Sequence, residues 1–333
     1  MKALKAGVIG LGVGERHLAG YLQSPNVSVQ AVCDIDPIRL KEVADRHGVP
    51  ERHLDYRGIT ENPDIDMVSI CSYDDSHAEQ CISAFQNGKH VMVEKPVVLS
   101  RHEGEAVLRA QQDSGKLITS NLILRRSPRF EELKTQITNG DFGDIFCIEG
   151  DYIHDILWKI TEGWRRKMAH YSVVYGGGIH LIDLMRWLLG REIQRVSAMG
   201  TNLRSRDSAY RFEDTVMALL DFEGGIVGKT LTTYAPRRTK FHALNIYGSK
   251  RTFINDLPNG KSFTSDQPED ESAVMTPYPG MDKGDLIPDF VAAIREGRHP
   301  RVTASDVFRV MDVCFAVQDS LNSGVTLTVT YSI

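Results

Sequence analysis

Two residues in the sequence have the types that proton transfer to or from an alcohol requires. They are Lys95, within "EKP", and His180, within "GGGIH". Oxidation of a secondary alcohol needs a base for the hydroxyl proton and an acceptor for the hydride, and a histidine titrates near neutral pH. A lysine loses its proton more readily when it is desolvated beside a positive charge. Taken alone, each has a plainer interpretation, as a surface lysine of a loop and as a core histidine.

A glycine-rich stretch, "GVIGLGVGERH", offers the matching acceptor site. Gly10, Gly12 and Gly14 are spaced G-x-G-x-G, one residue tighter than the dinucleotide fingerprint G-x-G-x-x-G. The stretch follows a short apolar run and opens a helical pattern, and Asp34 lies 20 residues past Gly14 at the end of the next apolar run. The alternative is a tight strand–helix turn without a ligand. We expect Gly14 to act as the third glycine of a tighter loop.

The same arrangement predicts which dinucleotide is bound. Backbone N–H groups at a helix N-terminus suit a pyrophosphate, and glycines allow its close approach. The carboxylate of Asp34 can accept hydrogen bonds from a ribose diol and would repel a 2′-phosphate. The sequence therefore favours NAD over NADP.

The elements that must position these residues alternate between strand and helix through the first part of the chain. The predicted strands are Ala6–Ile9, Val27–Cys33, Asp66–Cys71, His90–Val93 and Lys116–Ser120, and the predicted helices are Glu15–Gln23, Pro37–His47, Ser76–Gln86 and Ser100–Ser114. Such alternation predicts a doubly wound parallel sheet with right-handed crossovers, which is a Rossmann fold.

The pattern changes after about Arg125, where strand-like runs follow one another. The predicted strands are Ile145–Ile153, Val196–Asn202, Thr215–Asp221, Ile226–Tyr234, Phe241–Tyr247 and Arg251–Ile254; the predicted helices are Arg129–Thr138, Ile179–Leu189, Leu286–Glu296 and Ala304–Ser323. Runs of strands without intervening helices predict an antiparallel or mixed sheet. We expect two domains, 1–122 and 123–333, with a long surface excursion over Asp256–Gly284.

Composition narrows the class of protein. The 333 residues carry a net charge of −5 without a long basic run, which argues against nucleic-acid binding. Five cysteines without a C-x-x-C pair predict reduced thiols in a cytoplasmic protein. No apolar run approaches the ~20 residues that span a bilayer, and the N-terminal run is too short for a signal peptide.

The ordered set of motifs resembles the glucose–fructose oxidoreductase, inositol dehydrogenase and rhizopine-catabolism (Gfo/Idh/MocA) family. The matching segments are "GVIGLGVGERHLAGYL", "AVCDIDP", "VSICSYDDSHAEQCISAFQNGKHVMVEKPVVLS", "LRRSPRF", "GWRR" and "GGGIHLIDLMRWLLG". The resemblance covers nearly the whole chain. It implies a Rossmann domain followed by an α/β domain with a large open, mostly antiparallel sheet, and NAD(P)-dependent oxidation or reduction of a sugar, sugar derivative or cyclitol.

The resemblance also implies roles for individual residues. Lys95 and His180 fall on the family's catalytic positions. The expected cofactor-binding residues are Gly10, Gly12, Val13, Gly14, Asp34, Ile35, Cys71, Ser72, Tyr73, His77, Glu94, Lys95 and Asn121. The expected substrate-binding residues are Lys95, Arg125, Tyr152, Trp164, Arg165, His170, Tyr171, His180 and Asp183. No metal is expected.

One position departs from the family pattern. Members commonly carry an aspartate four residues before the histidine, where helical spacing brings the two side chains together. Here that position is Gly176. Tyr175, His170, Tyr171, Tyr152 and His154 are open candidates for the gap, and Asp183, one helical turn beyond His180, is a candidate for orienting it.

Three functions compete at this point. The first is an NAD(H)-dependent dehydrogenase or reductase acting on CH–OH groups of a sugar, a uronic acid, a nucleotide sugar or a cyclitol. The second is redox-assisted glycoside hydrolysis with tightly held NAD, and the third is a non-catalytic nucleotide-binding regulatory protein. An open sheet with uncovered apolar surface further predicts a homodimer or homotetramer.

Overall fold

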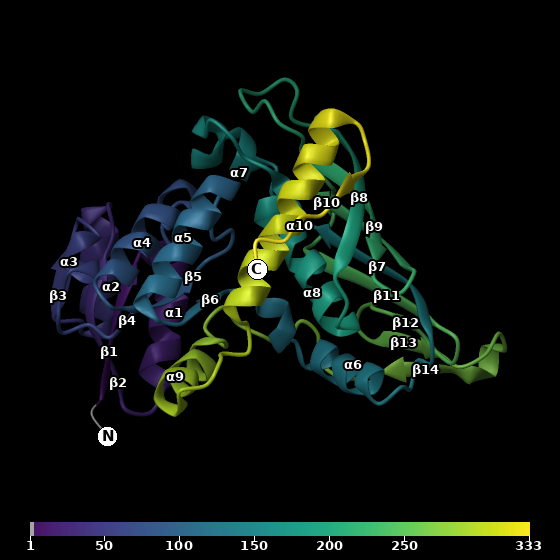
Figure 1. Ribbon diagram of the computed structural model, residues 1–333, viewed down its shortest axis with the longest axis horizontal. Helices are drawn as coiled ribbons and strands as arrows, with labels where there is room; N and C mark the ends of the chain where they lie inside the picture. Colours follow the sequence, from purple (N-terminus) through teal and green to yellow (C-terminus); the bar gives the residue numbers. More distant parts are fainter. Residues whose placement is uncertain (1–2) are drawn as a thin grey trace. The chain divides into compact units, whose positions relative to one another are not determined.

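A computed structural model describes residues 3–333, and its internal contacts divide the chain into two compact units (Figure 1). The N-terminal unit runs through Ile123 and also contains Asp282–Phe308 and Ile333. The second unit contains Leu124–Met281 and Arg309–Ser332. The first break lies next to the predicted boundary at 122, but the second unit is not the continuous segment 123–333 that the sequence suggested, because residues 282–308 belong to the N-terminal unit.

The N-terminal unit is built on a six-stranded sheet in the order β3-β2-β1-β4-β5-β6, with every neighbouring pair parallel. Its strands are β1 (Leu4–Ile9), β2 (Val27–Cys33), β3 (Glu51–His53), β4 (Met67–Ile70), β5 (His90–Val93) and β6 (Ile118–Ser120). Its helices are α1 (Leu11–Gln23), α2 (Pro37–His47), α3 (Arg57–Thr60), α4 (His77–Gln86), α5 (Arg101–Ser114) and α9 (Ile287–Glu296). This is the predicted doubly wound fold, with β3 and α3 added, which are too short to give a clear periodic signal.

Local sequence explains why these elements begin and end where they do. The central strands are mostly apolar, as strands covered on both faces are, and Val8, Ile70 and Val93 are fully buried. The side chain of Asp36 accepts hydrogen bonds from two N–H groups at the start of α2. Ser100 forms a capping box at the start of α5, which fixes the chain just beyond "EKP".

The second unit is built on a nine-stranded sheet in the order β14-β13-β12-β11-β7-β10-β9-β8-β15. Its strands are β7 (Ile145–Ile153), β8 (Ile193–Thr201), β9 (Thr215–Phe222), β10 (Ile226–Thr233), β11 (Phe241–Gly248), β12 (Thr252–Ile254), β13 (Gly260–Phe263), β14 (Glu271–Val274) and β15 (Leu327–Thr328). Only β7 and β10 pair in parallel among these described strands. The sheet is therefore mostly antiparallel, as expected.

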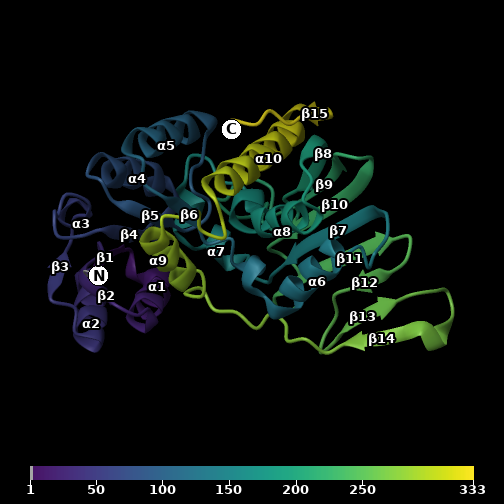
Figure 2. The ribbon, with the colours of Figure 1, turned by 60° about the horizontal axis from the view of Figure 1, so that its bottom comes forward.

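The predicted surface excursion over Asp256–Gly284 needs correction. It contains the hairpin β13–β14, which extends the sheet at one edge (Figure 2). The segment is rich in proline, glycine, serine and acidic residues, so its composition indicates a loop. β14 is the edge strand of this sheet, and a short edge strand needs little apolar sequence because only one of its sides pairs.

Helices cover one face of this sheet and leave the other open (Figure 1). The covering helices are α6 (Pro128–Thr138), α8 (Ile179–Leu189) and the part of α10 (Ala304–Ser323) from Arg309 onward. On the open face apolar side chains reach solvent, with Met199 79% and Leu219 62% exposed; Phe146, Met217 and Val227 are also exposed. Alternating burial along β9 produces this two-faced character.

Three further properties of residues 3–333 concern the cysteines, membrane-crossing helices and metal ligands. All five cysteines are free thiols. None of the helices within residues 3–333 has both the length and the apolar character that a membrane crossing requires. Among the same residues, no three His, Cys, Asp or Glu side chains gather in a way that could hold a metal ion.

Candidate active site and cofactor site

The glycine-rich turn joins β1 directly to α1. The helix starts at Leu11, four residues before the predicted start at Glu15, so Gly12 and Gly14 lie in its first turns. Gly10 has φ +82°, and a side chain there would also collide with the carbonyl oxygen of Cys71. A Cβ at Gly14 would lie 2.8 Å from Val8 Cγ1, which is the close helix–strand packing expected of a third glycine. The tighter G-x-G-x-G spacing therefore still serves the fingerprint.

The same turn leaves one side open. Gly12 is exposed, and a Cβ added there would meet no atom within 4 Å. The N-terminus of α1 thus presents backbone N–H groups beside open space, which suits a pyrophosphate. Val13, which follows, is half-buried.

Asp34 lies at the carboxyl end of β2 and is 5% exposed. Its Oδ2 accepts the N–H of Leu11 at 2.7 Å, and its Oδ1 accepts the N–H of Asp36 at 2.9 Å. Arg39 Nη1 lies 3.8 Å from Oδ2, while the neighbouring Ile35 is 73% exposed. Asp34 therefore ties the start of α1 to the end of β2, besides being placed as the fingerprint requires for a ribose diol.

The ends of β4, β5 and β6 carry the other predicted cofactor residues. Asn121 Nδ2 donates to Glu94 Oε1 at 2.8 Å, and both side chains are buried. The ring of His77 lies between two carbonyl oxygens, with Nδ1 2.7 Å from that of Pro96 and Nε2 3.2 Å from that of Ser72. His77 thus holds the "EKP" turn, which carries Lys95, against the loop after β4.

Two further residues of that loop have different surroundings. The hydroxyl of Ser72 donates to Gln80 Oε1 at 2.7 Å, whereas Tyr73 is 43% exposed. Cys71 is buried, and burial raises the pKa of its thiol well above the ordinary value. The thiol of Cys71 is therefore protonated at neutral pH and acts as packing.

One buried polar atom among these residues indicates that they fit an NAD cofactor. Asn121 Oδ1 is buried and finds no hydrogen-bond donor among residues 3–333. A buried acceptor left unmatched costs free energy, so a donor from a bound ligand would satisfy it. The open side of Gly12 and the carboxylate of Asp34 supply the rest of the cradle.

In the second unit, His180 lies in the first turn of α8 and is 7% exposed. Its ring stacks on Tyr152, a residue of β7, with ring centroids 6.1 Å apart and an angle of 20° between planes. The Tyr152 hydroxyl lies 3.1 Å from His154 Nδ1, and the ring of His242, from β11, lies 5.6 Å from that of Tyr152. The catalytic candidate therefore belongs to a cluster of imidazole and phenol rings.

The structure shows what surrounds the glycine that replaces the family aspartate. Gly176 lies in a π-helical turn, Val174–Gly178, that leads into α8. A Cβ built on Gly176 would come closest to the hydroxyl oxygens of Tyr171, at 2.0 Å, and Tyr234, at 2.3 Å. These hydroxyls lie 3.3 Å from each other. Two tyrosine hydroxyls therefore occupy the space of the missing side chain.

Among the sequence candidates for that gap, Tyr171 therefore lies at Gly176. The second hydroxyl comes from Tyr234, in the loop after β10, which the sequence did not indicate. The flanking glycines are equally constrained, because a Cβ at Gly177 would meet the Tyr152 ring at 2.6 Å. His170 packs its ring instead against Tyr175 and Phe212.

The imidazole and phenol rings around His180 are neutral at physiological pH. Burial, with added positive charge from Lys240 and Lys159, lowers the pKa of His154 to about 4. Burial and the charge of Lys240 hold the pKa of His242 well below its ordinary value. Burial also raises the pKa of Tyr234 well above the usual range. The cluster therefore offers neutral hydrogen-bonding groups.

Two other predicted substrate residues form an internal ion pair. Arg125 donates from Nε to Asp183 Oδ2 at 2.9 Å and from Nη2 to Oδ1 at 2.6 Å. Neither side chain is more than 2% exposed. Both oxygens of Asp183 thus accept hydrogen bonds from Arg125 within a buried ion pair.

The remaining candidates lie on the segment before the π-helical turn. The guanidinium of Arg165 stacks over the Trp164 ring at 4.1 Å and lies 5.4 Å from the Tyr171 ring. This places a cation against the Trp164 ring and close to Tyr171, one of the two tyrosines at Gly176. Stacked aromatic and guanidinium groups suit a polyhydroxylated ligand, which presents both C–H faces and hydroxyls.

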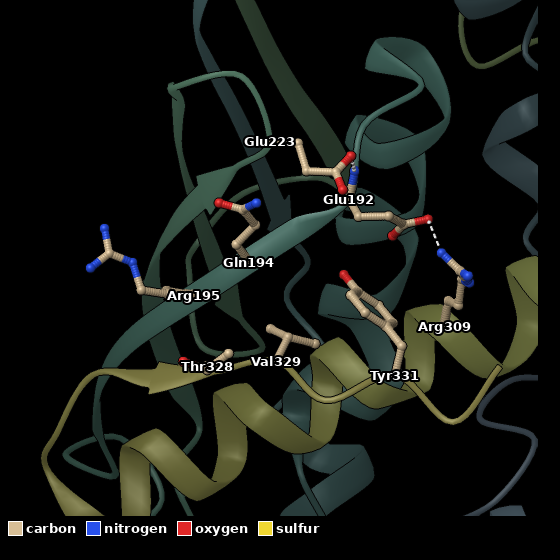
Figure 3. A pocket seen from close by; sticks show the side chains of 8 residues that line it. All are labelled: Glu192, Gln194, Arg195, Glu223, Arg309, Thr328, Val329 and Tyr331. Atoms are coloured by element: carbon tan, nitrogen blue, oxygen red, sulfur yellow. Dashed lines mark hydrogen bonds and ion pairs between the residues drawn. The ribbon is translucent and has the colours of Figure 1, made fainter.

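A separate hollow of about 450 Å³ lies between β8 and the C-terminal segment (Figure 3). Its lining contains none of the predicted site residues; it consists of Glu192, Gln194, Arg195, Glu223, Arg309, Thr328, Val329 and Tyr331. Arg309 donates to Glu192 at 3.1 Å, and Arg195 donates to Asp221 at 2.7 Å. Glu192, Arg195 and Arg309 are thus paired within the protein, and the hollow does not coincide with the site around His180.

Comparisons with known proteins define the class. Residues 4–122 match the "Oxidoreductase family, NAD-binding Rossmann fold", and residues 130–254 match the "GFO/IDH/MocA C-terminal domain". Together these matches cover most of the chain. The protein therefore belongs to the Gfo/Idh/MocA oxidoreductase family, and its first domain is an NAD-binding Rossmann domain. The predicted family, fold class, enzyme class and cofactor are confirmed.

Individual relatives extend this result. The chain is 31% identical over 232 residues to the uncharacterized oxidoreductase YrbE of Bacillus subtilis, an alignment covering 67% of this chain and 65% of that protein. It is 23% identical over 331 residues to myo-inositol 2-dehydrogenase of Thermotoga maritima, covering 96% of each. Levoglucosan dehydrogenase in complex with NADH and L-sorbose superposes with a TM-score of 0.88 at 25% identity, covering 98% and 99% of the two chains.

Sequence reasoning missed Tyr234 and His242 in the second unit and His17 in the first. Tyr234 and His242 come from segments predicted only as strands, and neither stands in a recognisable motif. His17 lies in the matched segment "GVIGLGVGERHLAGYL", but nothing in its spacing showed which residues it would contact.

Proposed function

We propose that the protein transfers a hydride between NAD(H) and a secondary alcohol or ketone of a sugar, a sugar derivative or a cyclitol. The observation that carries this is the surroundings of His180, where a titratable imidazole stacks on Tyr152 among neutral phenol and imidazole groups. Neutral donors and acceptors match the hydroxyls of a carbohydrate. The names of the relatives, which act on inositol and levoglucosan, support the same class.

Each catalytic residue has a distinct role in this proposal. His180 takes the hydroxyl proton during oxidation and returns it during reduction. Lys95 holds the reacting oxygen through its ammonium group. Bound NAD supplies the hydride acceptor, and NADH the donor. Tyr152, Tyr171 and Arg165 hold the other hydroxyls, and the tyrosine pair at Gly176 replaces a charged carboxylate with neutral hydrogen-bonding groups.

A substrate screen tests the proposal. The purified protein is incubated with NAD and a panel of sugars, uronic acids, nucleotide sugars and inositols, and the absorbance of NADH is followed. We expect turnover with at least one polyol, and its loss in His180→Ala. The proposal fails if no member of the panel is oxidised while NAD binding is intact, or if aryl glycosides are cleaved instead.

The open face of the second sheet supports a further proposal, that the protein is a homo-oligomer. Met199, Met217 and Leu219 form part of an exposed apolar surface that water solvates poorly. A second copy of the same face would bury it. Light scattering at micromolar concentration should show a dimer or tetramer, and Leu219→Glu should shift it to monomer with unchanged NADH affinity. A monomeric wild-type protein would refute this.

Free thiols at all five cysteines support a cytoplasmic location.

A further inference from the structure

The strand order of the N-terminal unit indicates which half of the cofactor faces which strand. The chain reverses direction across the sheet between β1 and β4, and dinucleotides bind at the carboxyl edge beside such a switch point. Asp34, at the end of β2, is placed for the adenosine ribose. The nicotinamide half therefore lies toward the ends of β4 and β5, and Glu94 is the first residue after β5.

A buried polar network underlies this edge. His17, from α1, is fully buried, and its Nε2 lies 3.4 Å from Glu94 Oε1. Its Nδ1 lies 3.1 Å from the hydroxyl of Ser69, on β4, and that hydroxyl lies 2.9 Å from the Tyr21 hydroxyl. Asn121, after β6, donates to Glu94 Oε1 at 2.8 Å. His17 and Asn121 thus both contact one oxygen of the Glu94 carboxylate, and Ser69 contacts the other nitrogen of the His17 ring.

The protons of this network can be assigned from its donors. Asn121 Nδ2 donates one hydrogen to Glu94 and the other to the carbonyl oxygen of Lys283, at 3.1 Å. The amide therefore has no hydrogen left for His17 Nε2, which is 3.2 Å away. His17 must carry its own hydrogen on Nε2 and donate it to Glu94. Two donors thus address the same carboxylate oxygen.

These donors keep Glu94 ionised. Burial by itself raises the pKa of Glu94, but the hydrogen bond from His17 and the positive charges of Lys283 and Lys95 hold that pKa well below its usual range. Lys283 comes from the segment that returns to this unit, which packs closely on α1: a Cβ at Gly20 would lie 2.8 Å from the Gly284 carbonyl oxygen. The fold therefore places a buried negative charge, with cations around it, at the sheet edge where the nicotinamide half of the cofactor would bind.

We infer that Glu94, fixed by His17 and Asn121, makes the site discriminate between the two redox forms of its cofactor. The oxidised nicotinamide ring carries a positive charge and the reduced ring carries none. A fixed carboxylate in a site of low dielectric attracts the first and is indifferent to the second. Glu94 therefore raises the affinity for NAD⁺ relative to NADH. The positive charges of Lys95 and Lys283 oppose this effect. His17 is a positioning residue for that carboxylate.

The experiment measures dissociation constants and needs no substrate. Kd for NAD⁺ is taken by calorimetry and Kd for NADH by fluorescence, for the wild-type protein and Glu94→Gln. We expect the ratio Kd(NAD⁺)/Kd(NADH) to rise about tenfold in Glu94→Gln, because a neutral amide replaces the charge at equal volume. Glu42→Gln, an exposed change on α2, is the matched control and should leave the ratio unchanged. Loss of both affinities by the same factor would overturn the inference.

Three further variants keep the inference falsifiable if Glu94→Gln does not fold. Lys283→Gln changes an exposed side chain and should move the ratio the opposite way, by about two- to threefold, because it removes an opposing cation. His17→Gln, which keeps a donor toward Glu94, should hold the ratio near wild type, and His17→Leu should raise it. A ratio that stays constant in Lys283→Gln and His17→Leu contradicts the inference. Because only binding is measured, the outcome is independent of the proposed substrate class.

Discussion

The two units treat carboxylates in opposite ways. In the N-terminal unit, Asp34 and Glu94 stand where the family pattern expects them, and each is held by hydrogen-bond donors of the protein. In the second unit, the position four residues before His180 has lost its carboxylate, and the hydroxyls of Tyr171 and Tyr234 fill the space. At these positions the first unit keeps buried negative charge, whereas the second places neutral phenol and imidazole rings around its histidine; its buried Asp183 is paired with Arg125.

The difference follows from what each unit must bind. A dinucleotide presents the same pyrophosphate, ribose and nicotinamide groups whatever the substrate, so Asp34 and Glu94 serve a ligand of fixed chemistry. A substrate differs from one enzyme to another, and its site can exchange a carboxylate for phenols when the new set satisfies its own hydrogen bonds. The glycine at position 176 is part of this exchange, because any larger residue would meet the tyrosines.

The largest expected effect separates catalysis from cofactor binding. Lys95→Ala and His180→Ala should each lower kcat on the identified substrate by ~100-fold or more, as the loss of a positioned acid–base group does. NADH affinity, measured by fluorescence titration, should change much less in His180→Ala than kcat does. His299→Ala, an exposed histidine of the N-terminal unit, is the control. Near-full turnover in His180→Ala would move the catalytic role to another member of the Tyr152 cluster.

A smaller effect tests the carboxylate of the first unit. Asp34→Ala should reduce the ratio Kd(NADPH)/Kd(NADH) by about tenfold, because repulsion of the 2′-phosphate disappears. Arg39, which lies beside Asp34, would then be released toward the phosphate. Asp64→Ala, an exposed change in the same unit, should leave the ratio unaltered. Equal affinities for NADPH and NADH in the wild-type protein would show that Asp34 does not select the cofactor.

The smallest effect tests the neutral replacement in the second unit. Gly176→Ala should lower the free energy of unfolding by ~1–3 kcal/mol, because its Cβ collides with two buried hydroxyls. The same change in a Tyr171→Phe, Tyr234→Phe background should cost less, since both oxygens are gone. Gly104→Ala, whose Cβ meets only Val98 at 3.6 Å, is the control in helix α5. Denaturant unfolding measures the free energy of unfolding of all these variants. If Gly176→Ala lowers that free energy equally with and without the two tyrosine hydroxyls, the proposed collision is wrong.

The sequence identified correctly those features that depend on neighbouring residues along the chain. The alternation of strand and helix and the glycine turn depend on short stretches of sequence, because periodicity and turn chemistry act locally. The predicted placement of Asp34 at the end of β2 and of Lys95 after β5 follows from the same register. The family resemblance added Lys95 and His180 as catalytic candidates, and their roles stay predictions.

The tertiary structure alone decided which distant residues meet. Tyr171 and Tyr234 are 63 positions apart, and Asn121 donates to a carbonyl 162 positions away. The return of residues 282–308 to the first unit and the hairpin β13–β14 also depend on surfaces built elsewhere in the chain. Burial and hydrogen-bond satisfaction act through space, so the partners of Glu94 and the neighbours of Gly176 are set only when the fold closes around them.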